Sequence, residues 1–175
     1  MHKLVAVLAT LAALAAVNLN IHGRERLLAE GRVVLLELAP VDPRSLMQGD
    51  YMALRFRIAN EAFGRDRLGA AKDGHIVAKV DGRGVASFAR FADAAVPLAA
   101  GEVLLRYRIR DRQPKFATNA FFFQEGHADR YQHARYGEFR VAPDGDMILT
   151  ALRDADFTLL GRADAPDGAG GSGGQ

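Results

Sequence analysis

The apolar N-terminal segment constrains this chain more than any other feature of its sequence. After Lys3, an uncharged run, LVAVLATLAALAAV, extends from Leu4 to Val17, and the next charged residue is Arg24. A membrane-spanning helix needs about 20 mostly apolar residues. Residues 4–21 approach that length when the two asparagines near the end of the segment lie at the membrane–water interface. We therefore expect residues 4–21 to contact membrane lipid.

Two other interpretations of this segment are a cleaved signal peptide and a buried helix of a soluble protein. A secretory signal peptide has a basic start, a short apolar run and a small-residue cleavage site, which Ala13-Leu14-Ala15 resembles. A buried helix of a soluble protein usually carries a polar stripe, which this run lacks. Good helix formers continue from Arg24 to Glu30, and Gly31 is typical of the residue just past a helix C-terminus. We expect an uncleaved signal-anchor helix that ends at Gly31.

The orientation of this anchor follows from the charges on either side of it. Lys3 and the α-amino group lie before the apolar run, and Arg24 and Arg26 lie after it, so the positive-inside rule is nearly balanced. A short N-terminal segment inserts most easily with the N-terminus in the cytoplasm. We therefore expect the rest of the chain on the extracytoplasmic side.

The composition limits the chemistry that the chain can perform. Its 175 residues fit one domain of about 100–150 residues with an appendage. The chain has no cysteine, which excludes disulfides, thiolate metal sites and a cysteine nucleophile. The net charge is +2, and the basic residues are interspersed with acidic ones rather than clustered, so we expect no nucleic-acid partner. The sequence also predicts no cofactor.

The chain after Gly31 predicts a β-rich domain. Apolar or alternating segments bounded by Gly, Pro and Asp are typical of strands. These segments are Arg32–Leu38, Tyr51–Ile58, His75–Val80, Val85–Phe91, Glu102–Arg110, Ala120–Phe123, Glu138–Val141 and Met147–Leu152. Residues 60–72 are expected to form a helical turn and a loop, and residues 81–84 and 143–146 are expected to form hairpin turns. We expect a mainly β fold, an antiparallel sandwich or small barrel of about seven strands with one N-terminal apolar helix.

Three parts are therefore expected along the chain. Residues 1–31 form the membrane anchor helix, and residues 32–160 form the extracytoplasmic β-rich domain. The tail, residues 161–175, ends in GAGGSGGQ and has little apolar surface to bury. A segment of that composition is expected to be disordered.

The octapeptide Gly49–Phe56, GDYMALRF, carries a family resemblance. It resembles the signature of the bacterial GDYXXLXY family, and Phe56 stands at the final tyrosine position, where it keeps the ring and loses the hydroxyl. Three further segments also resemble that family: ELAPVDPRSLMQGDYMALRF, GEVLLRYRIR and FFFQEGHADRYQHARYGEFRV. The resemblance covers most of residues 32–160.

The resemblance implies a membrane-anchored bacterial protein without an established activity. Members of this family are often encoded beside multi-pass membrane proteins. We therefore expect a single-pass protein of the bacterial inner membrane with a periplasmic domain. The preferred hypothesis is an accessory or binding module that docks on an integral membrane protein.

The candidate binding residues lie in the motif and on outward strand positions. The preferred interpretation of Gly49-Asp50-Tyr51 is structural, a turn at the strand entry, and the functional alternative is that Asp50, Tyr51 and Arg55 line a rim that holds a ligand or partner. Outward arginines form a basic sheet face if their strands are neighbours, and such a face suits anionic headgroups or an acidic partner. These arginines are Arg55, Arg57, Arg106, Arg108 and Arg110. Glu125 is a candidate binding residue, or a buried partner for an arginine.

Two chemical alternatives to the binding module are a Ser-Lys hydrolase and a metal site. Ser45 with Lys79 as its base would make a Ser-Lys envelope hydrolase, although no oxyanion hole is evident. His127, Asp129 and His133 include a pair at helical i, i+4 spacing, but the neighbouring arginines repel a cation. We expect no metal site and no catalytic residues.

Overall fold

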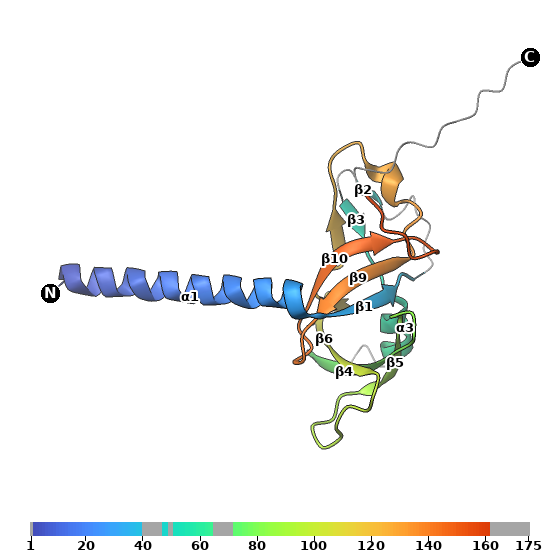
Figure 1. The fold of residues 1–175 in the computed structure, drawn as a ribbon, viewed down its shortest axis with the longest axis horizontal. Coiled ribbons are helices and arrows are strands. Elements are labelled where there is room, and N and C mark those ends of the chain that lie inside the picture. The colour runs from blue at the N-terminus through green and yellow to red at the C-terminus, as the bar shows by residue number, and fades with distance from the viewer. Residues whose placement is uncertain (1, 40–46, 49–50, 65–71, 162–175) are drawn as a thin grey trace, which may run out of the picture.

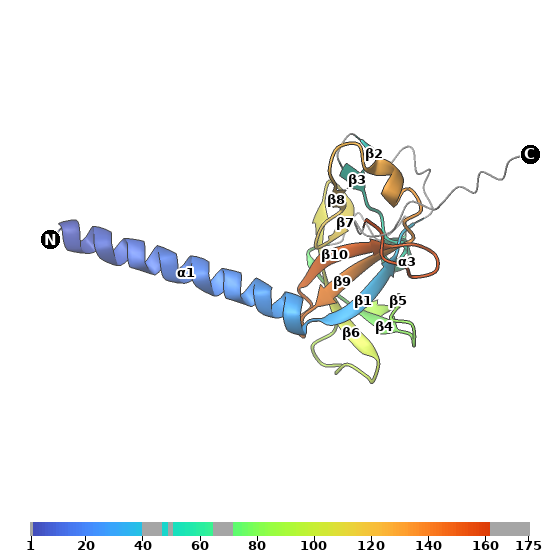
Figure 2. The same cartoon turned by 45° about the horizontal axis from the view of Figure 1, so that its top comes forward.

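The computed structural model describes residues 2–39, 47–48, 51–64 and 72–161 of the chain. In the first helix, side chains are described from Ala9 onward, apart from Ala12. Figures 1 and 2 show one long helix, α1 (His2–Glu30), that projects from a body of strands. The arrangement matches the expected combination of an N-terminal helix and a mainly β domain.

The described strands form three antiparallel sheets. The first has the order β1-β9-β10, with bounds Arg32–Glu37, Tyr136–Val141 and Met147–Arg153. The second has the order β5-β4-β6-β7, with bounds Ala86–Phe91, Gly74–Val80, Glu102–Arg110 and Gln113–Phe116. The third is small, in the order β2-β3-β8, with bounds Met47–Gln48, Tyr51–Ala53 and Ala120–Phe122. The described sheets pack as in a sandwich and do not close into the alternative small barrel.

The core between the sheets is built around aromatic rings. Phe63, Phe116 and Phe139 are among the largest fully buried side chains. The Phe56 ring packs edge-on against Phe139, with 5.4 Å between ring centroids, and Phe63 packs edge-on against Tyr107 at 4.8 Å. Edge-to-face pairs of this kind contribute about 0.5–1.5 kcal/mol beyond the burial of their area. The rings therefore join both large sheets to the short helix α3 (Arg57–Phe63).

Helix α1 passes directly into strand β1 at Gly31, which is buried. The Gly31 N–H donates to the Leu27 carbonyl at 2.9 Å, and the Arg140 guanidinium donates to the Gly31 carbonyl at 3.1 Å. The expected helix end is confirmed, but Gly31 is not left-handed. A side chain at this position would overlap the Leu27 carbonyl oxygen. Glycine is therefore required here because the Leu27 carbonyl lies too close to leave room for a side chain, and not because of the backbone conformation.

The strand expected over Tyr51–Ile58 is wrong in its second half. Strand β3 ends at Ala53, extended Phe56 forms an isolated bridge with Leu38, and helix α3 begins at Arg57. The alternating side chains of the extended part, Leu54 and Phe56, are nevertheless buried as expected. Helix α3 then buries Ile58, Ala62 and Phe63 at helical spacing. The buried side chains therefore change from every second residue to helical spacing, and the buried face continues across this change.

The sequence predicted strand β6 with its observed bounds but did not predict strand β7 (Gln113–Phe116). Asp111 and Arg112 join β6 to β7 with φ values of 52° and 57°. A tight hairpin turn needs such positive φ values, and glycine or asparagine normally supplies them. Pro114 lies on β7, which is an edge strand and therefore tolerates a missing N–H donor. The sequence therefore lacks both the glycine or asparagine of a usual hairpin turn and the alternating pattern of a usual strand at this hairpin.

Within the described residues, no helix combines the length and the apolar character needed to cross a membrane. The expected tail lies outside the described residues, apart from Gly161.

The buried ring of Phe139 is expected to be a major source of stability. Phe139 is 0% exposed and Phe122 is 71% exposed. Phe139→Ala should lower the free energy of unfolding by about 3–5 kcal/mol, because it removes a buried ring and leaves a cavity. Phe122→Ala, the matched control, should change it by less than about 0.5 kcal/mol. Chemical denaturation of the full chain in mild detergent, followed by circular dichroism, measures both. Equal midpoints for the two variants would contradict this account of the core.

Candidate functional site

The signature octapeptide contributes more to the core than to the surface. Asp50 lies outside the described residues. Met52, Leu54 and Phe56 are 3%, 1% and 2% exposed. The Leu54 N–H donates to the Asn119 carbonyl at 2.7 Å. The phenyl ring at the final tyrosine position is therefore a packing group, and no hydroxyl is needed where it lies.

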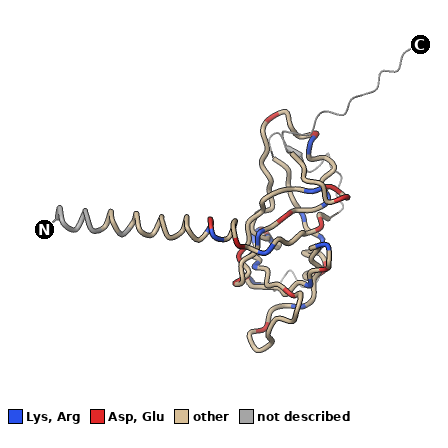
Figure 3. The backbone as a smooth tube through the Cα atoms, viewed as in Figure 1, with Lys and Arg blue, Asp and Glu red and all other residues tan. Residues whose placement is uncertain are grey.

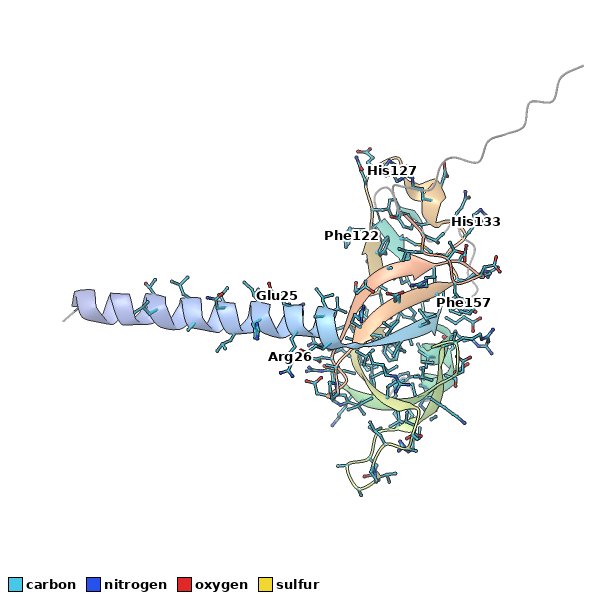
Figure 4. The ribbon with its side chains drawn as sticks, in the orientation of Figure 1. Glu25, Arg26, Phe122, His127, His133 and Phe157 are labelled. Carbon is cyan, nitrogen blue, oxygen red and sulfur yellow. The ribbon has the colours of Figure 1, made fainter. Side chains whose placement is uncertain are left out.

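Tyr51 is the motif residue that reaches the surface of the small sheet. It is half-buried and lies opposite Phe122 on the neighbouring strand β8, with 5.9 Å between their ring centroids. Phe122 itself is exposed, and Figure 4 shows it on the side of the domain from which α1 projects. We call Tyr51 and Phe122 the aromatic patch.

Arg55 lines a small cavity of about 390 Å³ at the turn between β6 and β7. Arg112 and Asn119 line the same cavity. The Asn119 side-chain oxygen is buried and accepts no hydrogen bond from the described residues. The cavity brings Arg55 together with a second cation, but not with Tyr51 or with the arginines of strand β6.

A larger cavity of about 730 Å³ lies where α1 meets the sheets, and we call it the basic crevice. Its helix wall is formed by the last turns of α1, and its other wall is formed by strands β6 and β7 and the turn between β9 and β10. The charged residues that line it are Arg24, Arg106, Arg108, Arg110, Lys115, Asp144 and Asp146. Cations therefore outnumber acids. Figure 3 shows the described part of α1 without charge until the helix approaches the sheets, where charged residues begin.

Three cations of the crevice are paired with carboxylates. Arg106 lies 2.8 Å from Asp146, and this hydrogen bond and the negative charge raise the pKa of Arg106. Arg110 lies 3.1 Å from Asp73, and Lys115 lies 3.4 Å from Asp111.

Asp73 also accepts the Ile109 N–H at 2.8 Å. That backbone hydrogen bond is the main cause that lowers the pKa of Asp73, and Arg110 adds to it. The strand that carries the arginines is thus tied at its end to a fixed carboxylate.

The basic sheet face expected from five arginines is wrong in its composition. Arg106, Arg108 and Arg110 do lie together on exposed positions of β6. Strand β3 pairs with β8 and not with β6, so Arg55 lies elsewhere. Arg57 belongs to helix α3, where it pairs with Glu37 at 3.0 Å and Glu61 at 3.1 Å.

Sequence reasoning missed two cations that complete the crevice. Arg24 is the first charge after the apolar run, which was a usable signal that it stands apart from the rest of that helix. Lys115 lies on β7, a strand that the sequence pattern did not predict. The sequence therefore gave no indication that Lys115 lines the crevice.

The remaining candidates do not converge in the described structure. Glu125 is exposed in the loop after β8, so it is not a buried partner for an arginine. The short 3₁₀ helix Ala128–Tyr131 ends before His133, and Figure 4 shows His127 and His133 apart. Among the residues that the structure describes, no group of three or more His, Cys, Asp or Glu is arranged to hold a metal ion.

Only one member of the proposed Ser-Lys pair lies within the described residues. Ser45 lies outside the described residues, and Lys79 is exposed on strand β4, opposite Glu102. Catalytic lysines are usually desolvated, because burial favours the neutral amine. The exposure of Lys79 therefore gives no support to a hydrolase.

The fold and the crevice define a class of protein, a sandwich-like β-domain carried directly on a long N-terminal helix. The sequence model of the GDYXXLXY protein matches residues 13–152, and the chain belongs to this family, which has no established activity. No curated protein and no solved structure matches the chain.

The carboxylate of Asp73 predicts a specific dependence of stability on pH. Its pKa lies below the ordinary 3.8 in the folded chain, so ionised Asp73 stabilises the fold above about pH 4. This contribution is lost as the pH falls through the folded-state pKa. Asp73→Asn should therefore lower the melting temperature at pH 7 and change it little near pH 2. Thermal melts across pH measure this difference. Asp129→Asn, an exposed carboxylate in the 3₁₀ helix, is the control, and the same pH-dependent loss in both variants would contradict the assignment.

Proposed function

We propose that this chain is a single-pass, membrane-anchored accessory protein of the bacterial inner membrane whose periplasmic β-domain binds an integral membrane partner. The observation that carries the proposal is the uncharged run Leu4–Val17, which leads through one helix into strand β1. Because Gly31 is the only residue between helix α1 and strand β1, an anchored helix would hold the domain close to the lipid surface.

The aromatic patch is the surface that we propose for the partner. Phe122 is 71% exposed beside half-buried Tyr51, on the side from which α1 projects. Exposed aromatic side chains are enriched in the centres of protein interfaces, where they bury a large area with few rotatable bonds. An anchored helix would direct this patch toward the bilayer, where the partner is embedded.

The described residues favour binding over catalysis. The motif side chains Met52, Leu54 and Phe56 are buried packing groups. Lys79, the base of the alternative Ser-Lys hydrolase, is exposed. No contact of the described chain supports that alternative.

The anchor is tested by placing charge in the apolar run. An arginine near the centre of a spanning helix costs about 2.5–3.5 kcal/mol on the insertion scale. The wild-type full chain should remain with membranes after alkaline carbonate extraction, and Leu11→Arg with Leu14→Arg should move it to the soluble fraction. Leu19→Arg, near the expected interface, is the matched control and should remain with membranes. A wild-type chain that is released by carbonate would overturn the proposed anchor.

The partner surface is tested by photocrosslinking in intact membranes. A photoreactive phenylalanine at position 122 should form an adduct with an integral membrane protein. The same residue placed at Val96, which is also an exposed apolar position (47%), is the matched control and should not form this adduct. Immunoblotting and mass spectrometry identify the adducts. Identical adducts at both positions, or none at position 122, would count against this surface.

A further inference from the structure

Two arginines of the basic crevice form no salt bridge with a carboxylate in the part of the chain that the structure describes, although the charge of Arg108 acts on Asp73. Among the described residues, no carboxylate forms a salt bridge with Arg24 or Arg108, whereas the other three cations each have one. The Arg24 side chain contacts the Asn20 amide oxygen at 3.4 Å, a long hydrogen bond to a neutral group. Arg24 comes from helix α1 and Arg108 from strand β6, so positive charge enters one cavity from two elements. Such an arrangement favours an anion.

The two acids of the crevice act on Arg106 and form no salt bridge with Arg24 or Arg108 among the described residues. Asp146 is already engaged by Arg106 at 2.8 Å. The Asp144 carboxylate accepts the Asp146 N–H at 3.0 Å, within its own turn. The guanidinium groups of Arg24 and Arg108, which form no described salt bridge, can therefore contact a phosphate group, for which their planar arrays of N–H donors are well suited.

The lining of the crevice is apolar as well as cationic. Leu19 and Leu27 contribute from helix α1, and Ile148 and Leu149 contribute from strand β10. Leu19 is 74% exposed, so an apolar surface is open to a ligand. A free phosphate ion would contact only the arginines. A lipid would use the apolar side chains as well.

The position of the crevice along α1 matches the headgroup level of a bilayer. Leu19 and Asn20 line the crevice and belong to the apolar segment, residues 4–21. Arg24 follows residue 21 by three positions, about 4.5 Å along a helix. We propose that the basic crevice binds the phosphate group of an anionic phospholipid, through Arg24 and Arg108. This inference rests on the anchored state proposed above and adds a specific lipid ligand to it.

The test uses the full chain in mild detergent and a soluble short-chain phosphatidylglycerol. Native mass spectrometry gives the bound fraction, and the probe is added without a bilayer, so the result does not depend on membrane insertion. Arg24→Gln with Arg108→Gln should raise the Kd about thirtyfold, as expected for the loss of two cations that contact an anionic lipid. Arg130→Gln with Arg135→Gln removes the same charge from exposed positions outside the crevice and should leave the Kd unchanged. Equal melting temperatures without lipid show that both double variants are folded.

Several outcomes would overturn the proposal. Equal binding of short-chain phosphatidylcholine, which carries the phosphate but no net charge, would show that the crevice does not select an anionic lipid. Equal binding of short-chain diacylglycerol, which has no phosphate, would show that the apolar lining alone is responsible. Displacement of the lipid by inorganic phosphate at similar concentration would indicate a small-anion site. Equal loss in both double variants would indicate a nonspecific charge effect. Recovery of a membrane protein that depends on Arg24 and Arg108, without retained lipid, would assign the crevice to an acidic protein partner instead.

Failure of this inference is distinguishable from failure of the proposed function. Carbonate extraction and the adducts at position 122 test the anchor and the partner. Lipid binding in detergent tests the crevice alone. A chain that remains in membranes but binds no phosphatidylglycerol in this assay would refute the lipid site and leave the anchor in place.

Discussion

The direct passage from helix α1 to strand β1 is the constraint on which the rest of the structure depends. Gly31 is buried, its N–H is bonded to the Leu27 carbonyl, and its carbonyl accepts a hydrogen bond from Arg140. Since no linker separates the two elements, the helix direction is coupled to the sheet β1-β9-β10. The basic crevice exists only because the end of α1 is held against the strands in this way.

The motif and the candidate binding surfaces have different physical roles. Of the described signature residues, Met52, Leu54 and Phe56 are buried, and the Phe56 ring packs against Phe116 and Phe139. The buried residues of this segment therefore serve the folding of the core, while Tyr51 and Ala53 are half-buried and Arg55 is exposed. The charge and the larger cavity lie instead between α1 and β6, elements that are distant in sequence.

The arginines show how far sequence reasoning extended and where it stopped. Alternation predicted correctly that Arg106, Arg108 and Arg110 share one exposed side of a strand. It did not predict which strands are neighbours, and β3 pairs with β8 rather than with β6. Acidic residues far along the chain then pair with some of these cations, as Asp146 does with Arg106, whereas Arg24 and Arg108 form no salt bridge with a described carboxylate. Non-local pairing therefore decided which charges remain available.

The sequence by itself determined the family, the end of α1 at Gly31, the bounds of β6 and the burial of alternate residues, because all of these depend on local composition and period. The tertiary structure alone decided that Arg57 belongs to a helix, that Pro114 lies in an edge strand, and that helix and sheet enclose the crevice. Side-chain periodicity records which face of an element is buried. It carries no information about which distant element covers that face, because packing free energy is gained only when the elements meet.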